Sequence, residues 1–234
     1  MKQIIKGKEP QSFVDWKMSK QYEESKNNPP RVRSIYARFK KTKKVKTPVK
    51  NSLMAEQGYI CCYCECRIGA DNSHIEHLIP RDSEFQKSLD YDNLLCCCQK
   101  DLGEKDLGEK DLEVKHLKVN KHCGHSKLKN ILPISPLNPD CETRFIFDDY
   151  GQILPAQEDD DEAKKTIEIL QLNVPKLKAL RKSVIDPFRN LYLDPDQDQE
   201  ELRTFISDYL EKNSEGEYGE CWTTIKCLFG DFLH

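Results

Sequence analysis

The spacing of apolar residues in the last third of the chain predicts helices. From Asp159 onward such residues recur at intervals of three and four, which marks one face of two consecutive helices. They are Ile167, Leu170, Leu177, Leu180, Val184 and Phe188. Asn173 and Pro175 stand where the second helix would be capped and begin.

Two further elements are expected after a hinge at Asp194–Asp196. An acidic helix is predicted near residues 199–212, and an amphipathic segment follows it. The apolar side of that segment carries Trp222, Ile225, Phe229 and Phe232. Such a side is more typical of a core or a partner interface than of a ligand site.

Shorter elements are predicted before residue 58. Gln3–Lys6 has the pattern of a short strand, a helix is expected around Phe13–Glu24, and Asn27–Pro30 would end it. Leu53–Gln57 is expected to form a short helical lead-in to a cysteine- and histidine-rich core. We therefore predict an α+β fold in three parts, residues 1–57, 58–150 and 151–234, with helices mainly in the outer two.

A short repeat interrupts the central part. The unit Asp-Leu-Gly-Glu-Lys occurs twice, and then once imperfectly, within residues 100–116. Five residues are far too few for a repeat that stacks into a solenoid. We interpret the segment as a polar insertion without chemistry of its own.

Charge is distributed unevenly along the chain. Residues 1–50 hold 15 Lys and Arg against 4 Asp and Glu, a net of +11, so the remainder carries −14 of the total of −3. A basic arm beside an acidic body is typical of proteins that bind phosphate backbones. The residues expected to contact nucleic acid are Lys40, Lys41, Lys43, Lys44, Arg81 and Lys127.

Cysteine usage predicts a metal site. Eight of the eleven cysteines lie between Cys61 and Cys123, and the chain begins without an apolar signal core or a membrane-length apolar stretch. In a reducing cytoplasm, where we expect this protein, clustered cysteines bind metal rather than pair as disulfides. Cys61 and Cys64 have the spacing that places two thiolates on one Zn²⁺. A member of Cys96–Cys98 and Cys123 are candidates to complete the site.

A second kind of chemistry is indicated between these cysteines. His74, Glu76 and His77 follow one another closely, and in an extended strand His74 and Glu76 would share one face. A twist near the strand end would let Glu76 and His77 line the same site. A carboxylate can hold Mg²⁺ or a similar ion, while a neutral imidazole takes a proton from attacking water.

The order of these motifs resembles that of HNH endonucleases, whose ββα-metal core lies within a four-cysteine zinc site. The similarity covers Cys61 to Lys127. It implies that Glu76 helps to bind a catalytic divalent ion, that His77 is the general base, and that Asn93 braces the loop between strands. It also implies Cys98 as the third and Cys123 as the fourth zinc ligand, although Cys97 remains an alternative to Cys98.

One position departs from that pattern. Many such enzymes place the last catalytic metal ligand directly after the final cysteine, where this chain has Gly124. His125 is the best match to that ligand, and His122 is the alternative. His74 is expected to be a neighbour of the site or a substrate contact.

The flanking residues narrow the resemblance. Ile4–Pro10, Leu132–Pro136 and Leu170–Val174 look like parts of the PtuB-type HNH proteins of retron and Septu antiphage systems. Such a resemblance implies an endonuclease for nucleic acid, most simply DNA, that acts as the effector of a defence complex. The implied partners are an ABC/SMC-like ATPase of the PtuA type and a retron reverse transcriptase with its multicopy single-stranded DNA.

Two other functions fit part of the sequence. The chain could be a zinc-dependent nucleic-acid-binding adaptor without cleavage, but Glu76, His77 and Asn93 argue against that loss. A thiol oxidoreductase built on Cys61 and Cys64 would leave the second cysteine group unexplained.

Overall fold

The computed structural model describes residues 1–99, 121–193 and 199–233. The repeat within residues 100–116 and the hinge at Asp194–Asp196 lie outside the described residues. Within these ranges the protein combines many helices with two small antiparallel sheets, as expected for an α+β chain. No helix in this part is both long and apolar enough to cross a membrane.

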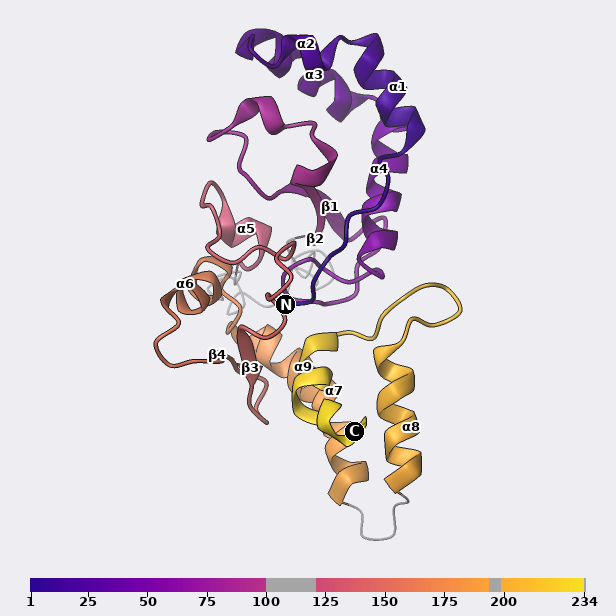
Figure 1. Cartoon of the computed structure of the whole chain (residues 1–234), viewed down its shortest axis with the longest axis vertical. Coiled ribbons are helices and arrows are strands. Elements are labelled where there is room, and N and C mark those ends of the chain that lie inside the picture. Colours follow the sequence, from indigo (N-terminus) through magenta and orange to yellow (C-terminus); the bar gives the residue numbers. More distant parts are fainter. Residues whose placement is uncertain (100–120, 194–198, 234) are drawn as a thin grey trace, which may run out of the picture.

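Four helices form one end of the molecule (Figure 1). They are α1 (Gln11–Ser19), α2 (Tyr22–Ser25), α3 (Pro29–Lys41) and α4 (Lys43–Glu56). The single helix expected around Phe13–Glu24 was wrong, because Gln21 adopts a left-handed backbone, φ 52°, and separates α1 from α2. Asn28 caps α3, since its side-chain oxygen accepts from the Arg31 N–H.

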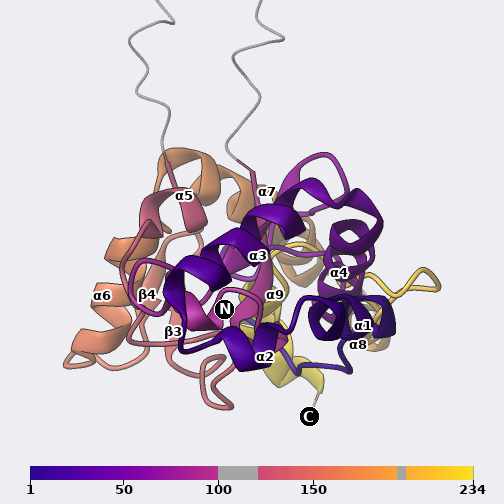
Figure 2. The same cartoon turned by 90° about the horizontal axis from the view of Figure 1, so that it is seen from above.

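The basic arm is therefore helical. The Arg31–Lys50 stretch lies in α3 and α4, which bury Val32, Ile35, Phe39 and Val49 and leave most of the basic side chains exposed. Figure 2 shows both helices from above. The strand expected at Gln3–Lys6 was wrong. Among the described residues this segment belongs to no strand, although the Ile4 N–H donates to the Pro136 carbonyl at 2.8 Å.

The middle of the molecule holds a two-stranded sheet. Strand β1 (Ser73–His77) pairs with β2 (Leu94–Cys98) in antiparallel register, with Glu76 opposite Leu95 and His77 opposite Leu94. The connection contains two 3₁₀ turns, η1 (Phe85–Lys87) and η2 (Tyr91–Asn93). A single helical turn, α5 (Gly124–Lys127), lies against this sheet through Lys127 and Gly124.

The second sheet and the remaining helices complete the fold. Strands β3 (Phe145–Phe147) and β4 (Ile153–Pro155) form a hairpin. The helices are α6 (Asp161–Leu170), α7 (Pro175–Leu193), α8 (Gln199–Leu210) and α9 (Trp222–Phe229), followed by the 3₁₀ turn η4 (Gly230–Leu233). The predicted pair of helices after Asp159 is confirmed, and so is the acidic helix near 199–212.

Helix α7 begins at Pro175, as predicted, so Val174 rather than Asn173 stands at its N-cap position. The Asn173 side chain instead accepts from the Ile153 N–H and donates to the Ile153 carbonyl, both at 2.9 Å. It thereby ties the start of α7 to β4, a long-range contact that local spacing cannot show.

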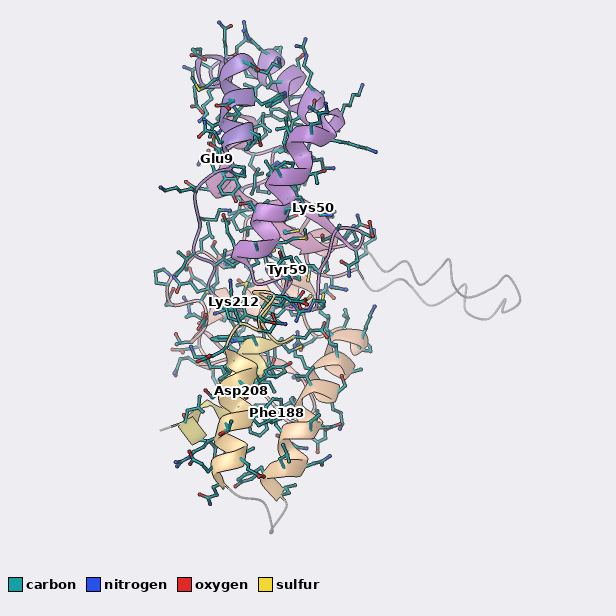
Figure 3. All side chains as sticks on the ribbon, turned by 90° about the vertical axis from the view of Figure 1, so that its right-hand side faces the viewer. Glu9, Lys50, Tyr59, Phe188, Asp208 and Lys212 are labelled. Atoms are coloured by element: carbon teal, nitrogen blue, oxygen red, sulfur yellow. The ribbon has the colours of Figure 1, made fainter. Side chains whose placement is uncertain are left out.

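Two apolar clusters support the structure. The larger runs from Met1 to Leu177 and surrounds β1 and β2. The smaller joins α7, α8 and α9 through Ile185, Phe188, Ile206 and Ile225. Figure 3 shows Phe188 and Asp208 at this lower end, with Lys50 and Tyr59 nearer the middle. The β1–β2 sheet, which carries the predicted chemistry, thus lies between two helical regions.

Candidate active site and thiol cluster

Three chain segments bring cysteine sulfurs together. The turn from Cys61 to Cys66 is closed by the Cys61 N–H, which donates to the Cys66 carbonyl at 2.9 Å. The end of β2 supplies Cys97 and Cys98, and Cys123 precedes α5. Within the described residues these thiols form groups whose ligand atoms all lie within 4.8 Å of one another.

The spacing of the sulfurs suits a metal ion. Four thiolates placed tetrahedrally about 2.3 Å from zinc lie about 3.8 Å from one another. Cys98 Sγ lies 3.6 Å from Cys61 Sγ and 3.8 Å from Cys64 Sγ. The cluster is therefore able to hold a metal ion.

All four predicted zinc ligands, Cys61, Cys64, Cys98 and Cys123, lie in this cluster. Cys97 and His122 reach it as well. Cys66 also joins it, with its Sγ 3.3 Å from Cys64 Sγ. The sequence held a signal for it, because Cys64 and Cys66 form a second close pair within the same turn.

Glu76 is a nearly buried carboxylate with two partners. Its Oε2 lies 3.5 Å from His74 Nε2, and its Oε1 lies 3.2 Å from the Lys127 Nζ. Burial raises the pKa of Glu76, but His74 and Lys127 outweigh that effect and hold the pKa below its usual value. Glu76 is therefore an anion at neutral pH, as a ligand for a divalent cation must be.

His77 lies at the end of the same strand. Its Nε2 is 3.0 Å from the Ser88 carbonyl, and its ring meets Tyr36 edge-on with centroids 5.6 Å apart. A carbonyl can only accept, so this contact assigns the ring proton to Nε2 and leaves the lone pair on Nδ1. Burial lowers the pKa of His77 to about 4, so the imidazole is neutral at neutral pH.

Glu76 and His77 line the same open cleft, of about 340 Å³. Pro80, Arg81, Asp82, Leu128 and Lys129 complete its lining. The side chains of Glu76 and His77 would leave opposite faces of an ideal strand, but both reach this cleft at the end of β1. The guanidinium of Arg81 lies 4.6 Å from the centre of the Tyr36 ring.

His125 lies beside His74, with the two rings edge-on and their centroids 5.1 Å apart. The residue before His125 is Gly124, and the structure shows why a larger residue does not fit there. A Cβ there would lie 2.7 Å from Glu76 Oε2 and 3.1 Å from His74 Nε2. Glu76 and His74 thus occupy the space that a residue-124 side chain would need. His122, the alternative to His125, lies in the thiol cluster, 3.2 Å from Cys123 Sγ through its Nδ1.

Asn93 holds the connection between the strands. Its side-chain oxygen accepts from the Ile79 N–H at 2.7 Å, and its amide donates to the Ile79 and Lys87 carbonyls, both at 3.1 Å. These bonds fix the loop that carries Arg81 and positions the Ser88 carbonyl beside His77.

The residues expected to contact nucleic acid fall into two groups. Lys40, Lys41, Lys43 and Lys44 are exposed on α3 and α4, and Arg81 is half-buried at the cleft. Lys127, also expected to contact nucleic acid, differs from them. It is fully buried, and its Nζ donates to the His77 carbonyl at 2.8 Å and pairs with Glu76.

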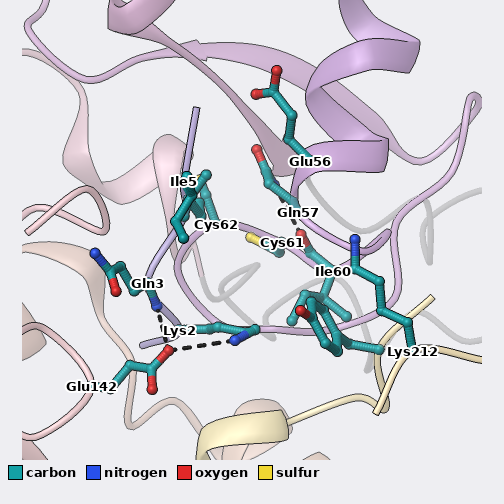
Figure 4. Close-up of a pocket in the computed structure, with 12 residues that line it drawn as sticks. Lys2, Gln3, Ile5, Glu56, Gln57, Ile60, Cys61, Cys62, Glu142 and Lys212 are labelled. Carbon is teal, nitrogen blue, oxygen red and sulfur yellow. Dashed lines mark hydrogen bonds and ion pairs between the residues drawn. The ribbon is translucent and has the colours of Figure 1, made fainter. Parts of the chain in front are cut away.

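A separate cavity of about 370 Å³ lies beside the N-terminal segment (Figure 4). There Glu142 accepts from the Gln3 N–H at 2.9 Å and lies 3.4 Å from the Lys2 Nζ. Neither Glu76 nor His77 lines this cavity. Glu142 pairs with Lys2 and Glu56 with Lys6, so we do not place the chemistry here.

A buried carboxylate and a neutral imidazole that share an open cleft are the groups that metal-assisted hydrolysis uses. Over 149 residues the chain is 29% identical to a protein of Vibrio cholerae serotype O1 biovar El Tor named "Retron Vc95 putative HNH endonuclease". The match covers 61% of this chain and 65% of that relative, less than two thirds of its length. No protein-family model matches the chain. The likeness supports the resemblance to retron-type HNH endonucleases.

Proposed function

We propose that the protein is a metal-dependent HNH-type endonuclease whose ββα core consists of β1, β2 and α5. The observation that carries this proposal is that Glu76 and His77 line one cleft while the Ser88 carbonyl orients the His77 ring. The anion and the neutral base are thus side by side in the protonation states that phosphodiester hydrolysis requires.

In the proposed mechanism, His77 Nδ1 accepts a proton from the water that attacks phosphorus. Glu76 and His125 would hold a divalent ion such as Mg²⁺, and His74 lies next to both, with its Nε2 3.5 Å from Glu76 Oε2 and its ring against that of His125. When bound, the ion would neutralise charge on the phosphate and on the leaving oxygen. Lys127 holds Glu76 Oε1, which leaves Oε2 on the side of His74.

The thiol cluster has a different role in this proposal. Cys61, Cys64, Cys98 and Cys123 would hold structural zinc in a closed site, which contributes folding free energy rather than chemistry. Both predicted metal sites share one scaffold, because β1 and β2 carry Glu76 and Cys98 and α5 follows Cys123 directly.

Nucleic acid would approach along α3. Lys40 lies 5.7 Å from the Tyr36 ring, and Tyr36 also contacts Arg81 and His77. Tyr36 thus lies between Lys40, at the α3–α4 junction, and the residues of the cleft. Lysines spaced in this way suit a phosphate backbone, and DNA is the proposed substrate.

The retron name of the relative motivates the proposed context. We assign residues 1–57 to a basic extension, 58–150 to the nuclease domain and 151–234 to a helical region. The chain would be the effector of an antiphage complex, controlled by a PtuA-type ATPase and associated with a retron reverse transcriptase and its single-stranded DNA. Such control would spare the host cell from a free nuclease.

The test is copurification from the native operon, followed by cleavage assays on DNA and tRNA with added Mg²⁺ or Mn²⁺. Each assay compares the wild type with Glu76→Gln. Divalent-ion-dependent cleavage by the wild-type complex, lost in Glu76→Gln, supports the proposal. Equal cleavage by both proteins would refute the site. Binding of nucleic acid without cleavage in every condition would show that the chain is an adaptor instead.

A further inference from the structure

The thiol cluster contains more sulfurs than one tetrahedral ion can use. Among the described residues, two of the groups that meet the geometric condition for a metal site consist of the following four cysteines each. The first comprises Cys61, Cys64, Cys66 and Cys98, and the second comprises Cys61, Cys97, Cys98 and Cys123. The two groups share Cys61 and Cys98. Six thiols in all take part, and a single zinc would leave two of them without a metal.

Shared sulfurs are what a two-metal cluster requires. Two tetrahedra that share one edge need two bridging thiolates about 3.8 Å apart, with two further thiolates for each ion. Cys61 Sγ and Cys98 Sγ, the shared pair, are 3.6 Å apart. Each of these two sulfurs also lies near a cysteine that the groups do not share. Cys61 Sγ is 3.8 Å from Cys97 Sγ, and Cys98 Sγ is 3.8 Å from Cys64 Sγ.

Backbone donors reach two of the six sulfurs. The Cys98 N–H donates to Cys61 Sγ at 3.4 Å, and the Gly124 N–H donates to Cys97 Sγ at 3.3 Å. Such donors favour a thiolate over a thiol. Buried thiolates need compensating charge, because an isolated buried anion is costly. Two divalent ions would offset four of the six negative charges, whereas one would offset two.

We propose that the cluster binds two zinc ions, with Cys61 and Cys98 as bridging ligands. Cys64 and Cys66 would complete the site of one ion, and Cys97 and Cys123 that of the other. This proposal rests on the structural thiolate site proposed above but replaces its single ion with two, so that Cys64 and Cys123 bind different ions. It does not rest on the nuclease chemistry. It adds Cys66 and Cys97 to the ligands, and it makes loading of the cluster release more protons than a single site would.

The first test is the zinc content per chain of the purified protein, measured by mass spectrometry of the metal. A Glu76→Gln His125→Ala background removes zinc bound at the candidate catalytic site. We expect two zinc ions per chain in this background and one in the same background with Cys66→Ser. Cys227→Ser, which changes an exposed cysteine outside both groups, is the matched control and should retain two. One zinc per chain before the Cys66 substitution would overturn the proposal.

A second measurement does not depend on the folding of a variant. The metal-free wild-type chain is titrated with Co²⁺, and the thiolate-to-cobalt absorption is followed. Saturation at two equivalents supports the two-metal cluster. Saturation at one equivalent would contradict it and would favour a single-ion site, for instance the group of Cys64, Cys98, His122 and Cys123. Neither measurement uses cleavage, so a failure of the nuclease proposal leaves this one intact.

Discussion

A Cβ at residue 124 would lie 2.7 Å from Oε2 of Glu76, closer than any ordinary contact allows. Gly124 is the one position at which this chain departs from the metal-ligand pattern that it resembles. The carboxylate of Glu76 and the ring of His74 fill the space beside it. The lack of a side chain at Gly124 and the position of His74 beside Glu76 are therefore linked.

Gly124→Ala tests that arrangement. The new methyl group should displace Glu76 or His74 and lower cleavage at least tenfold, because an error of about 1 Å at a reacting centre costs about 100-fold. Thermal stability should fall by less than in Lys127→Met, because Gly124 has an ordinary helical backbone, alanine favours helices and Lys127 remains in place. Gly69→Ala is the control, because its Cβ would meet nothing closer than 3.8 Å. Full activity in Gly124→Ala would mean that Glu76 and His74 need not keep these positions.

Lys127→Met tests the internal ion pair. The substitution keeps much of the side-chain volume but leaves Glu76 as a buried charge without its Lys partner. Removing one member of a buried pair typically costs about 3–5 kcal/mol in the free energy of unfolding. Chemical denaturation without added divalent ion measures it. Lys129→Met, an exposed lysine at the same cleft, should change stability by less than about 0.5 kcal/mol. Equal stability of the two variants would contradict the assigned pairing.

Glu65 connects the cysteine turn to the last helix. It is buried between Cys64 and Cys66, and its carboxylate accepts from the N–H and the hydroxyl of Thr223 at 2.8 and 2.6 Å. Glu65→Ala leaves these donors unsatisfied and should destabilise the protein by about 1–3 kcal/mol for each buried group.

Glu65→Gln keeps the shape and one acceptor oxygen, so it should lose less stability than Glu65→Ala. Urea unfolding, followed separately by zinc release and by circular dichroism, measures both effects. If Glu65→Ala released zinc at the same urea concentration as the wild type, the stability of the cysteine turn would not depend on its contact with α9.

Replacing Lys40, Lys41, Lys43 and Lys44 with Gln should weaken DNA binding equally for all sequences. It should also flatten the dependence of affinity on salt, because each lysine that contacts a phosphate contributes about 0.9 to the logarithmic slope. The matched control replaces Lys164 and Lys182, exposed lysines of α6 and α7 that pair with Asp161 and Asp186. An unchanged slope in the first variant would indicate that the α3–α4 junction binds a partner rather than DNA.

Much of the helical structure could be predicted because each helix has an apolar face of its own. The spacing of Ile167 and Leu170 predicted α6 correctly, and the start of α7 at Pro175 followed from local rules. Asn173 was misinterpreted because its partner, Ile153, belongs to a strand twenty residues earlier. The N-terminal helix was predicted as one piece because a left-handed residue such as Gln21 gives no pattern in the sequence.

The candidate site was predictable as a set of residues but not as an arrangement. Glu76, His77 and the cysteines stood out by type and order. Burial of Lys127 was missed, because a lysine near the end of a motif carries no sign that it points inward. The closeness of His74 to both Glu76 and His125, and of Cys66 to Cys64, depends on how the strand, α5 and the turn pack together.

The most direct test of the account is the cleavage activity of His77→Ala, measured with Mg²⁺ on the same DNA and in the same partner complex as the wild type. Because His77 supplies the base, the variant should lose at least 100-fold in rate while its zinc content matches that of the wild type and the protein remains folded at the assay temperature. Cleavage at the wild-type rate by a correctly folded, zinc-loaded His77→Ala protein would contradict the assignment of this cleft as the nuclease site.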